Sequence, residues 1–102
     1  MEKYLCNAFS LQMIDWTDKD EVTIKIKKVA KPETFDGYTS AVGHADTAHV
    51  LGVEPNRINV KLGENDDLLV AQIMGGRLPE GATTLPEGFH MDFFEVQEVT
   101  QQ

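Results

Sequence analysis

The amino-acid sequence predicts an α+β fold, in which a single mixed β-sheet of about five strands carries one or two flanking helices. Two stretches alternate apolar and polar residues with the period of a half-buried strand, and the residues after Gly43 have helical spacing. With 102 residues and 41% hydrophobic composition, the chain is large enough for one core and too short for two. We therefore expect one domain over residues 1–102, and a two-fold dimer would enlarge this small core.

Five segments of the chain are predicted to form strands. In VTIKIKKV, the apolar residues would face the core and the lysines a solvated surface. LLVAQI is apolar throughout most of its length, which is typical of a strand buried on both faces. The predicted strands are, in order, Tyr4–Phe9, Val22–Val29, Ile58–Leu62, Leu68–Ile73 and Met91–Val99.

A short helix is predicted between the second and third of these strands. Ala45 and Ala48 begin an apolar stripe with helical spacing soon after Gly43, and Gly52 is expected to end the helix. The chain would then turn at Pro55 into the next strand.

The charge of the chain limits its partners. Seventeen acidic residues oppose nine basic ones, and the net charge is −8. Binding to long nucleic acid relies on many cations that neutralise phosphates, so we do not expect it. A small anionic ligand held by a few well-placed donors remains compatible with this charge.

Cysteine usage and hydropathy predict a cytoplasmic protein. The single cysteine, Cys6, cannot form an internal disulfide and lies in an apolar run, as expected in a reducing compartment. The first residues, MEKYLCNAFS, do not resemble a signal peptide, and no segment approaches the length of a membrane span. We expect no contact with a membrane.

The three histidines do not predict a metal site. His44 and His49 are about 140 degrees apart around a helix, so they would not point at one ion. Asp46 and His49 would share a face, but two ligands do not make a site. His90 is expected at the start of a strand, where a surface position is the simpler interpretation.

His44 and the two arginines are the residues most suited to an anionic ligand. His44 follows Gly43 at the start of the predicted helix, where backbone N–H groups favour an anion; a solvent-facing residue is the alternative. Arg57 and Arg77 both lie beside predicted strand ends, and the planar guanidinium suits phosphate.

Five short motifs, in order, resemble the viral ring nucleases. These are type III anti-CRISPR enzymes of archaeal viruses and bacteriophages, with relatives in integrative elements and beside CRISPR loci. The resemblance runs from about residue 3 to residue 98. The motifs are NAFSLQM (7–13), SAVGHADTAHVLG (40–52), NRINVKL (56–62), LLVAQ (68–72) and GRLPEGA (76–82).

The resemblance implies a homodimer that binds cyclic tetra-adenylate, the second messenger of type III CRISPR systems, and cleaves it to linear di-adenylates. The reaction would need no metal and no cofactor, because the 2′-hydroxyl of the substrate is the nucleophile. Loss of the messenger would switch off the ribonucleases that it activates. For a virus or phage, the protein would act in the host cytoplasm.

The motifs also imply which residues act. The family's catalytic histidine corresponds to His44, as proton donor to the leaving oxygen, and its arginine and glutamate correspond to Arg77 and Glu80. Arg77 would stabilise phosphorane charge, and Glu80 would position Arg77 or the ribose. The implied ligand-binding residues are Asn7, Ser10, Arg57 and Gln72. Relative to the family pattern, Met74-Gly75-Gly76 places one extra residue before Arg77.

Two other functions fit the same sequence. A protein of this fold could bind a cyclic nucleotide without cleaving it, although the presence of His44 disfavours this. A small acidic accessory protein of a virus or mobile element could instead bind a host protein through its negative surface.

Overall fold

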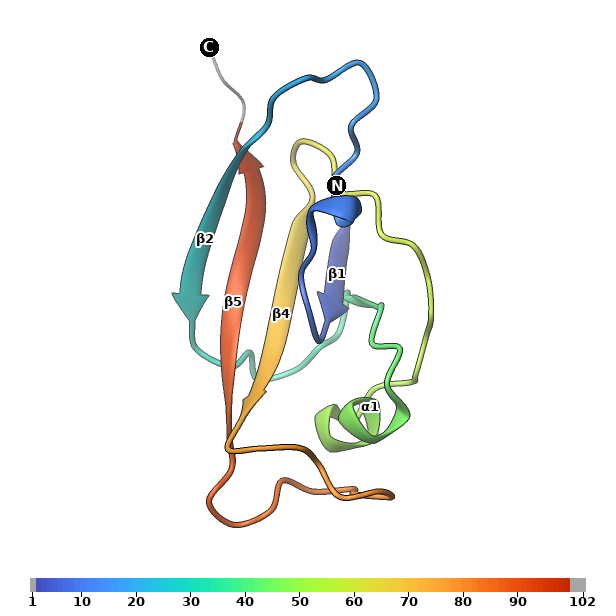
Figure 1. Ribbon diagram of the computed structural model, residues 1–102, viewed down its shortest axis with the longest axis vertical. Coiled ribbons are helices and arrows are strands. Elements are labelled where there is room, and N and C mark those ends of the chain that lie inside the picture. Colours follow the sequence, from blue (N-terminus) through green and yellow to red (C-terminus); the bar gives the residue numbers. More distant parts are fainter. Residues whose placement is uncertain (1, 100–102) are drawn as a thin grey trace.

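The computed structural model describes residues 2–99 and contains one five-stranded mixed sheet with a single α-helix (Figure 1). The predicted α+β class is therefore confirmed. The strands lie in the order β2-β5-β4-β1-β3. The elements are β1 (Lys3–Cys6), the 3-10 helix η1 (Leu11–Met13), β2 (Thr23–Val29), β3 (Thr39–Ser40), α1 (Ala45–Leu51), β4 (Asp67–Met74) and β5 (His90–Val99).

Two kinds of strand pairing divide the sheet. The long strands β2, β5 and β4 pair antiparallel, from Thr23 opposite Val99 to Met74 opposite His90. On the other side of β4, strands β1 and β3 are both parallel to it. Three adjacent strands, β4, β1 and β3, thus run in the same direction and end at the same edge of the sheet.

Both faces of the sheet are covered by apolar side chains. Because side chains alternate along a strand, Leu69 and Ala71 of β4 face one side, and Leu68 and Val70 face the other; all four are buried. This confirms that the strand is buried on both faces. The buried residues on the α1 side are Leu5, Val42, Ala48, Leu51, Leu69, Ala71 and Phe93, and those on the opposite side are Cys6, Ile14, Val60, Leu62, Leu68, Val70 and Val96.

The helix α1 has the limits that its sequence predicts. His44 is its N-cap, and Gly52 ends it in the left-handed conformation, with φ of 76°. Ala48 and Leu51 are the apolar side chains that it buries against the sheet. None of the helices within residues 2–99 is long and apolar enough to cross a membrane.

The prediction of a strand at Ile58–Leu62 is wrong. The segment is extended, but its only strand-like contact is an isolated bridge between Leu62 and Ile14. Val60 and Leu62 are buried against the face opposite α1, whereas Ile58 is 40% exposed. The alternation arises because one side of the segment packs on the sheet from outside, without pairing in it. The fifth strand is instead β3.

The first strand is shorter than predicted. β1 ends at Cys6, and Asn7 begins a loop that returns to η1, so the apolar residue Phe9 packs on the core from outside the sheet. Polar Asn7 marks the point at which strand pairing stops.

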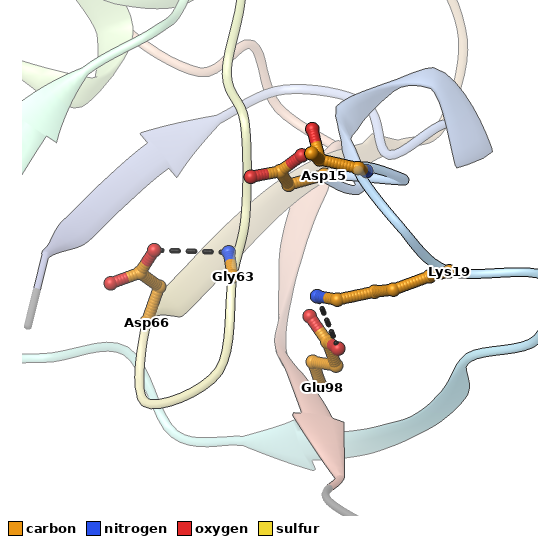
Figure 2. Close-up of polar contacts among 6 residues, drawn as sticks. Asp15, Lys19, Gly63, Asp66 and Glu98 are labelled. Atoms are coloured by element: carbon orange, nitrogen blue, oxygen red, sulfur yellow. Dashed lines mark hydrogen bonds and ion pairs between the residues drawn. The ribbon is translucent and has the colours of Figure 1, made fainter.

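Polar contacts hold the loops at the end of the sheet where β5 finishes (Figure 2). Lys19 Nζ lies 2.8 Å from Glu98 Oε1, and Gly63 donates its backbone N–H to Asp66 over 3.0 Å. Hydrogen bonds from Thr17 lower the pKa of Asp15, and the hydrogen bond with Glu98 raises the pKa of Lys19. The contact between Lys19 and Glu98 ties the segment before β2 to β5.

Candidate active site

Most of the predicted site residues lie at or after the ends of the parallel strands. Asn7 directly follows β1, His44 lies a short distance after β3, and Gln72 lies near the end of β4. The loop that follows β4 carries Arg77 and Glu80. In Figure 1 the arrowheads of β1 and β4 point toward the end of the sheet where α1 lies. Ligands commonly bind at the carboxyl ends of parallel strands, so this end of the molecule is the candidate site.

His44 is held in one orientation by the helix that it begins. Its Nδ1 accepts a hydrogen bond from the backbone N–H of Thr47 at 3.3 Å, and Thr47 Oγ1 lies at the same distance. A ring nitrogen that accepts a hydrogen bond carries no proton, so the neutral ring has its proton on Nε2. His44 is exposed, and Nε2 is the nitrogen left for a ligand.

Arg57 lies beside the residue that precedes His44. Its Nε donates to the carbonyl oxygen of Gly43 at 3.2 Å, and a Cβ built on Gly43 would lie only 3.1 Å from Arg57 Cγ. Glycine at position 43 therefore allows the arginine to lie against the chain next to the histidine. The structure brings one predicted ligand-binding residue to the predicted catalytic residue.

Asn56 fixes the segment that carries Arg57. Its side-chain Nδ2 donates to Ser40 O at 2.7 Å, and its backbone N–H donates to Val42 O at 2.9 Å. The Ser40 hydroxyl donates to Glu54 O at 2.7 Å. These bonds attach residues 54–57 to the end of β3, so that the position of Arg57 does not depend on strand pairing.

The loop after β4 is attached to α1 near His44. The backbone N–H of Gly81 donates to Asp46 Oδ1 at 3.3 Å. Arg77 and Glu80 belong to this loop and are exposed, and their side chains make no hydrogen bond or ion pair with any of residues 2–99. The loop is thus anchored, while its two charged side chains are available to a ligand.

Glycines allow this loop to leave β4. Gly75 has φ of 117° and Gly76 has φ of 136°, values that L side chains rarely adopt. A Cβ on Gly75 would also lie 3.0 Å from Phe89 Cα. Gly75 and Gly76 therefore provide the backbone conformations with which the chain passes from β4 into this loop.

Asn7 and Gln72 line a cavity of about 390 Å³ on the sheet face opposite α1. Its walls are mainly apolar, and the two amides are its polar side chains. The other residues that line it are Ala8, Phe9, Ile26, Val70, Phe94 and Val96.

Ser10 lies apart both from His44 and from the cavity that contains Asn7 and Gln72. It lines a separate groove of about 600 Å³ beside η1, together with Lys61 and the exposed side chains of Leu11, Trp16 and Ile58. The indole of Trp16 donates to Leu11 O at 3.0 Å, which fixes the ring in this groove. The structure does not bring Ser10 to His44.

The remaining histidines and the cysteine are not part of the candidate site. His49 is exposed in the last turn of α1, and His90 Nε2 lies 3.6 Å from Asp92 Oδ2. Residues 2–99 contain no group of three or more His, Cys, Asp or Glu side chains arranged to hold a metal ion. Burial raises the pKa of the Cys6 thiol to about 11, so this cysteine is not a reactive nucleophile.

Sequence reasoning missed three residues that position the site: Asp46, Thr47 and Asn56. Asn56 precedes Arg57 in an irregular segment, where an amide often bonds to backbone. Asp46 and Thr47 occupy the first turn of the helix, where short polar side chains often cap, but the sequence does not say which loop they meet. The fold supplies the partners of Asp46 and Asn56, whereas Thr47 meets His44 within the first turn of α1.

The protein belongs to the STIV B116-like family, because the family's model matches residues 3–95. It is a small protein of the STIV B116 type. Among solved structures, it is similar to B116 of Sulfolobus turreted icosahedral virus, with a TM-score of 0.74 and 24% sequence identity. That match covers 95% of this chain and 99% of the viral chain. No curated protein matches the sequence.

Proposed function

We propose that this protein is a metal-independent ring nuclease that binds cyclic tetra-adenylate and cleaves it to linear di-adenylates. The observation that carries the proposal is the convergence at one end of the sheet. His44, Arg57 and the loop that bears Arg77 and Glu80 come from separate parts of the chain and are joined through Gly43 and Asp46. A histidine and two arginines brought to one end of the sheet are suited to a reacting phosphate.

The mechanism assigns one role to each of these side chains. The 2′-hydroxyl of one adenylate attacks the adjacent phosphorus in line, its proton passes to water, and the bond to the 5′-oxygen breaks. The protonated His44 ring donates the Nε2 proton to that 5′-oxygen. Arg57 and Arg77 stabilise the negative charge of the phosphorane, and Glu80 orients Arg77 or the ribose. The product ends in a 2′,3′-cyclic phosphate.

The cavity that contains Asn7 and Gln72 supports an adenylate as the ligand. Phe9 and Phe94 provide apolar and aromatic walls, against which a base can stack. Side-chain amides match the donor and acceptor pattern of adenine at N6 and N7. With a base in this cavity, the rest of the nucleotide would extend past the carboxyl ends of β1 and β4, where the candidate site lies.

The distribution of charge is compatible with an anionic substrate despite the net charge of −8. Glu64, Asp66 and Asp67 lie at the start of β4, whereas Arg77 follows its end. These acidic residues are thus separated from Arg77 by the length of β4. Near His44, Arg57 lies against Gly43, and the acidic side chain of Asp46 bonds to the backbone of the loop that bears Arg77.

A two-fold homodimer is part of the proposal. The four-fold cyclic substrate contains a two-fold axis, so two identical chains can contact its two halves in the same way, each with one His44. Light scattering during gel filtration measures the mass directly. A dimer is expected at micromolar concentration, and a monomer that still cleaves the substrate would contradict this part.

The proposed activity is tested with cyclic tetra-adenylate in EDTA. The wild-type protein and the variant His49→Ala should bind and cleave it, because His49 is an exposed residue of the same helix outside the site. His44→Ala should bind without cleaving. Binding without cleavage by the wild type would favour a sequestering module. Absence of binding would refute both functions and favour an accessory protein of viral or mobile-element origin that binds a host protein.

A further inference from the structure

Thr47 is a buried polar residue with a contact that the proposed mechanism does not yet use. It is 6% exposed, the one polar or charged residue among 2–99 that is buried. Its hydroxyl lies 3.3 Å from Nδ1 of His44, and its backbone N–H lies at the same distance. Two groups of one residue therefore meet the same ring nitrogen.

These two groups differ in what they can do when His44 gains a proton. The backbone N–H can only donate, so it bonds to Nδ1 of the neutral ring and faces another donor once Nδ1 is protonated. The hydroxyl can donate to the neutral ring and accept from the charged ring. Only the hydroxyl can therefore bond to His44 in both states.

We infer that Thr47 is the positioning residue of His44: its hydroxyl accepts the Nδ1 proton of the charged ring and thereby keeps Nε2 directed at the leaving oxygen. This inference rests on the proposed function, because it concerns the proton donor of that reaction. During the reaction, the proton leaves Nε2 for the 5′-oxygen, and the ring retains the proton on Nδ1 that Thr47 accepts. A proton from solvent then restores Nε2.

The burial of Thr47 makes its hydroxyl a fixed partner. Ala48 and Leu51, its neighbours in α1, pack in the core, so the helix cannot rotate to move the hydroxyl away from the ring. The exposed ring of His44 is thus held in its orientation by the buried residue Thr47 beside Nδ1. Rotation of the ring would require the loss of both contacts to Nδ1.

Two substitutions separate the hydroxyl from the other properties of Thr47. Thr47→Val keeps the shape and the backbone N–H and removes the hydroxyl, whereas Thr47→Ser keeps the hydroxyl. We expect Thr47→Val to lower kcat about tenfold to a hundredfold, the range for a hydrogen bond to a charged group, with KM nearly unchanged. Thr47→Ser should retain most of the wild-type kcat. Circular dichroism and thermal melting check that both variants fold.

Nuclear magnetic resonance of the free protein provides a readout that needs no substrate. At acidic pH, the Nδ1–H signal of His44 should be protected from exchange with water in the wild type and in Thr47→Ser, and broadened in Thr47→Val. An unchanged signal in Thr47→Val overturns the inference, as does a kcat equal to that of the wild type. If the wild type does not cleave cyclic tetra-adenylate, the proposed function fails, and the Nδ1–H signal still decides whether Thr47 holds the ring.

Discussion

Arg57 donates from Nε to the carbonyl oxygen of Gly43 over 3.2 Å, and this bond places a guanidinium next to the N-cap histidine of α1. The two residues are joined across the chain without belonging to paired strands. Asn56 makes this possible, because it bonds once to Ser40 at the end of β3 and once to Val42 in the segment that leads to α1. An extended segment outside the sheet thus contributes to the candidate site.

Removal of the Arg57 guanidinium should weaken the binding of cyclic tetra-adenylate. We expect Arg57→Ala to raise Kd about tenfold, the lower limit for a hydrogen bond to a charged group, because Arg57 is exposed. Arg57→Lys keeps the charge but loses the planar guanidinium, so its Kd should lie between that of the protein with Arg57 and that of Arg57→Ala. Lys25→Ala, on the edge strand β2, is the control; isothermal titration with His44→Ala as background avoids cleavage. Equal affinities for all four proteins would show that Arg57 has no part in binding.

Asp46 should control the opening of the loop that carries Arg77. Removal of its carboxylate in Asp46→Ala leaves the Gly81 N–H without its acceptor. Loss of a hydrogen bond worth about 1 kcal/mol should make the amide exchange of Gly81 about fivefold faster. Asp46→Asn retains an acceptor oxygen and should exchange nearly as the wild type does. Hydrogen exchange measured by NMR gives the rate, and no change in Asp46→Ala would mean that the loop is held elsewhere.

Gly75→Ala should destabilise the start of the same loop. The substitution places a Cβ 3.0 Å from Phe89 Cα at φ of 117°, and we expect a loss of about 1 to 3 kcal/mol in the free energy of unfolding. Gly37→Ala is the matched control, because Gly37 also has positive φ, 84°, but nothing lies within 4 Å of a Cβ there. Urea unfolding compares the two variants. If the free energy of unfolding falls by the same amount in Gly75→Ala and Gly37→Ala, the contact with Phe89 adds nothing to the backbone strain.

Burial of Cys6 predicts a loss of stability at alkaline pH. Its thiol pKa is raised from 9.0 to about 11 in the folded protein, chiefly by burial, so the folded state holds the proton more tightly than the unfolded state. The resulting stability is present below pH 9 and is lost as the pH rises through 11. We expect the ionisation of Cys6 to lower the free energy of unfolding by about 2 kcal/mol between pH 8 and pH 10.5.

The variant Cys6→Ala isolates this contribution. It should be less stable than the wild type at pH 8, because it leaves a cavity, and the difference should shrink as the pH rises. Urea unfolding at both pH values measures it. A constant difference between the two proteins would contradict a buried, protonated thiol.

Much of the fold could be predicted because most strands and the helix carry their own periodicity. β2, β4 and β5 begin or end within one residue of the predicted limits, and Gly52 ends α1 as expected. β3 has only two residues, too few to show a pattern. In Ile58–Leu62, alternation reports burial on one side, which the sequence cannot distinguish from pairing in a sheet.

The candidate site could be predicted in composition but not in arrangement. The resemblance of the motifs indicated His44, Arg57 and Arg77, and the fold joins Arg57 to Gly43, the residue that precedes His44. The attachment of Gly81 to Asp46 joins residues far apart in the sequence and depends on the packing of α1 against the sheet. Ser10 has the same kind of motif support, yet it lies in the groove beside η1.

The proposed activity of His44 is best tested by the single-turnover rate of cyclic tetra-adenylate cleavage in EDTA, measured for the wild type and for His44→Ala at saturating protein. We expect the wild type to convert the ring to di-adenylates with 2′,3′-cyclic phosphate ends. His44→Ala should bind with similar affinity and cleave at least about a hundredfold more slowly, as loss of a general acid predicts. Equal rates for the two proteins would contradict the role of His44 as proton donor. No cleavage by the wild type once metal is removed would contradict a metal-independent ring nuclease.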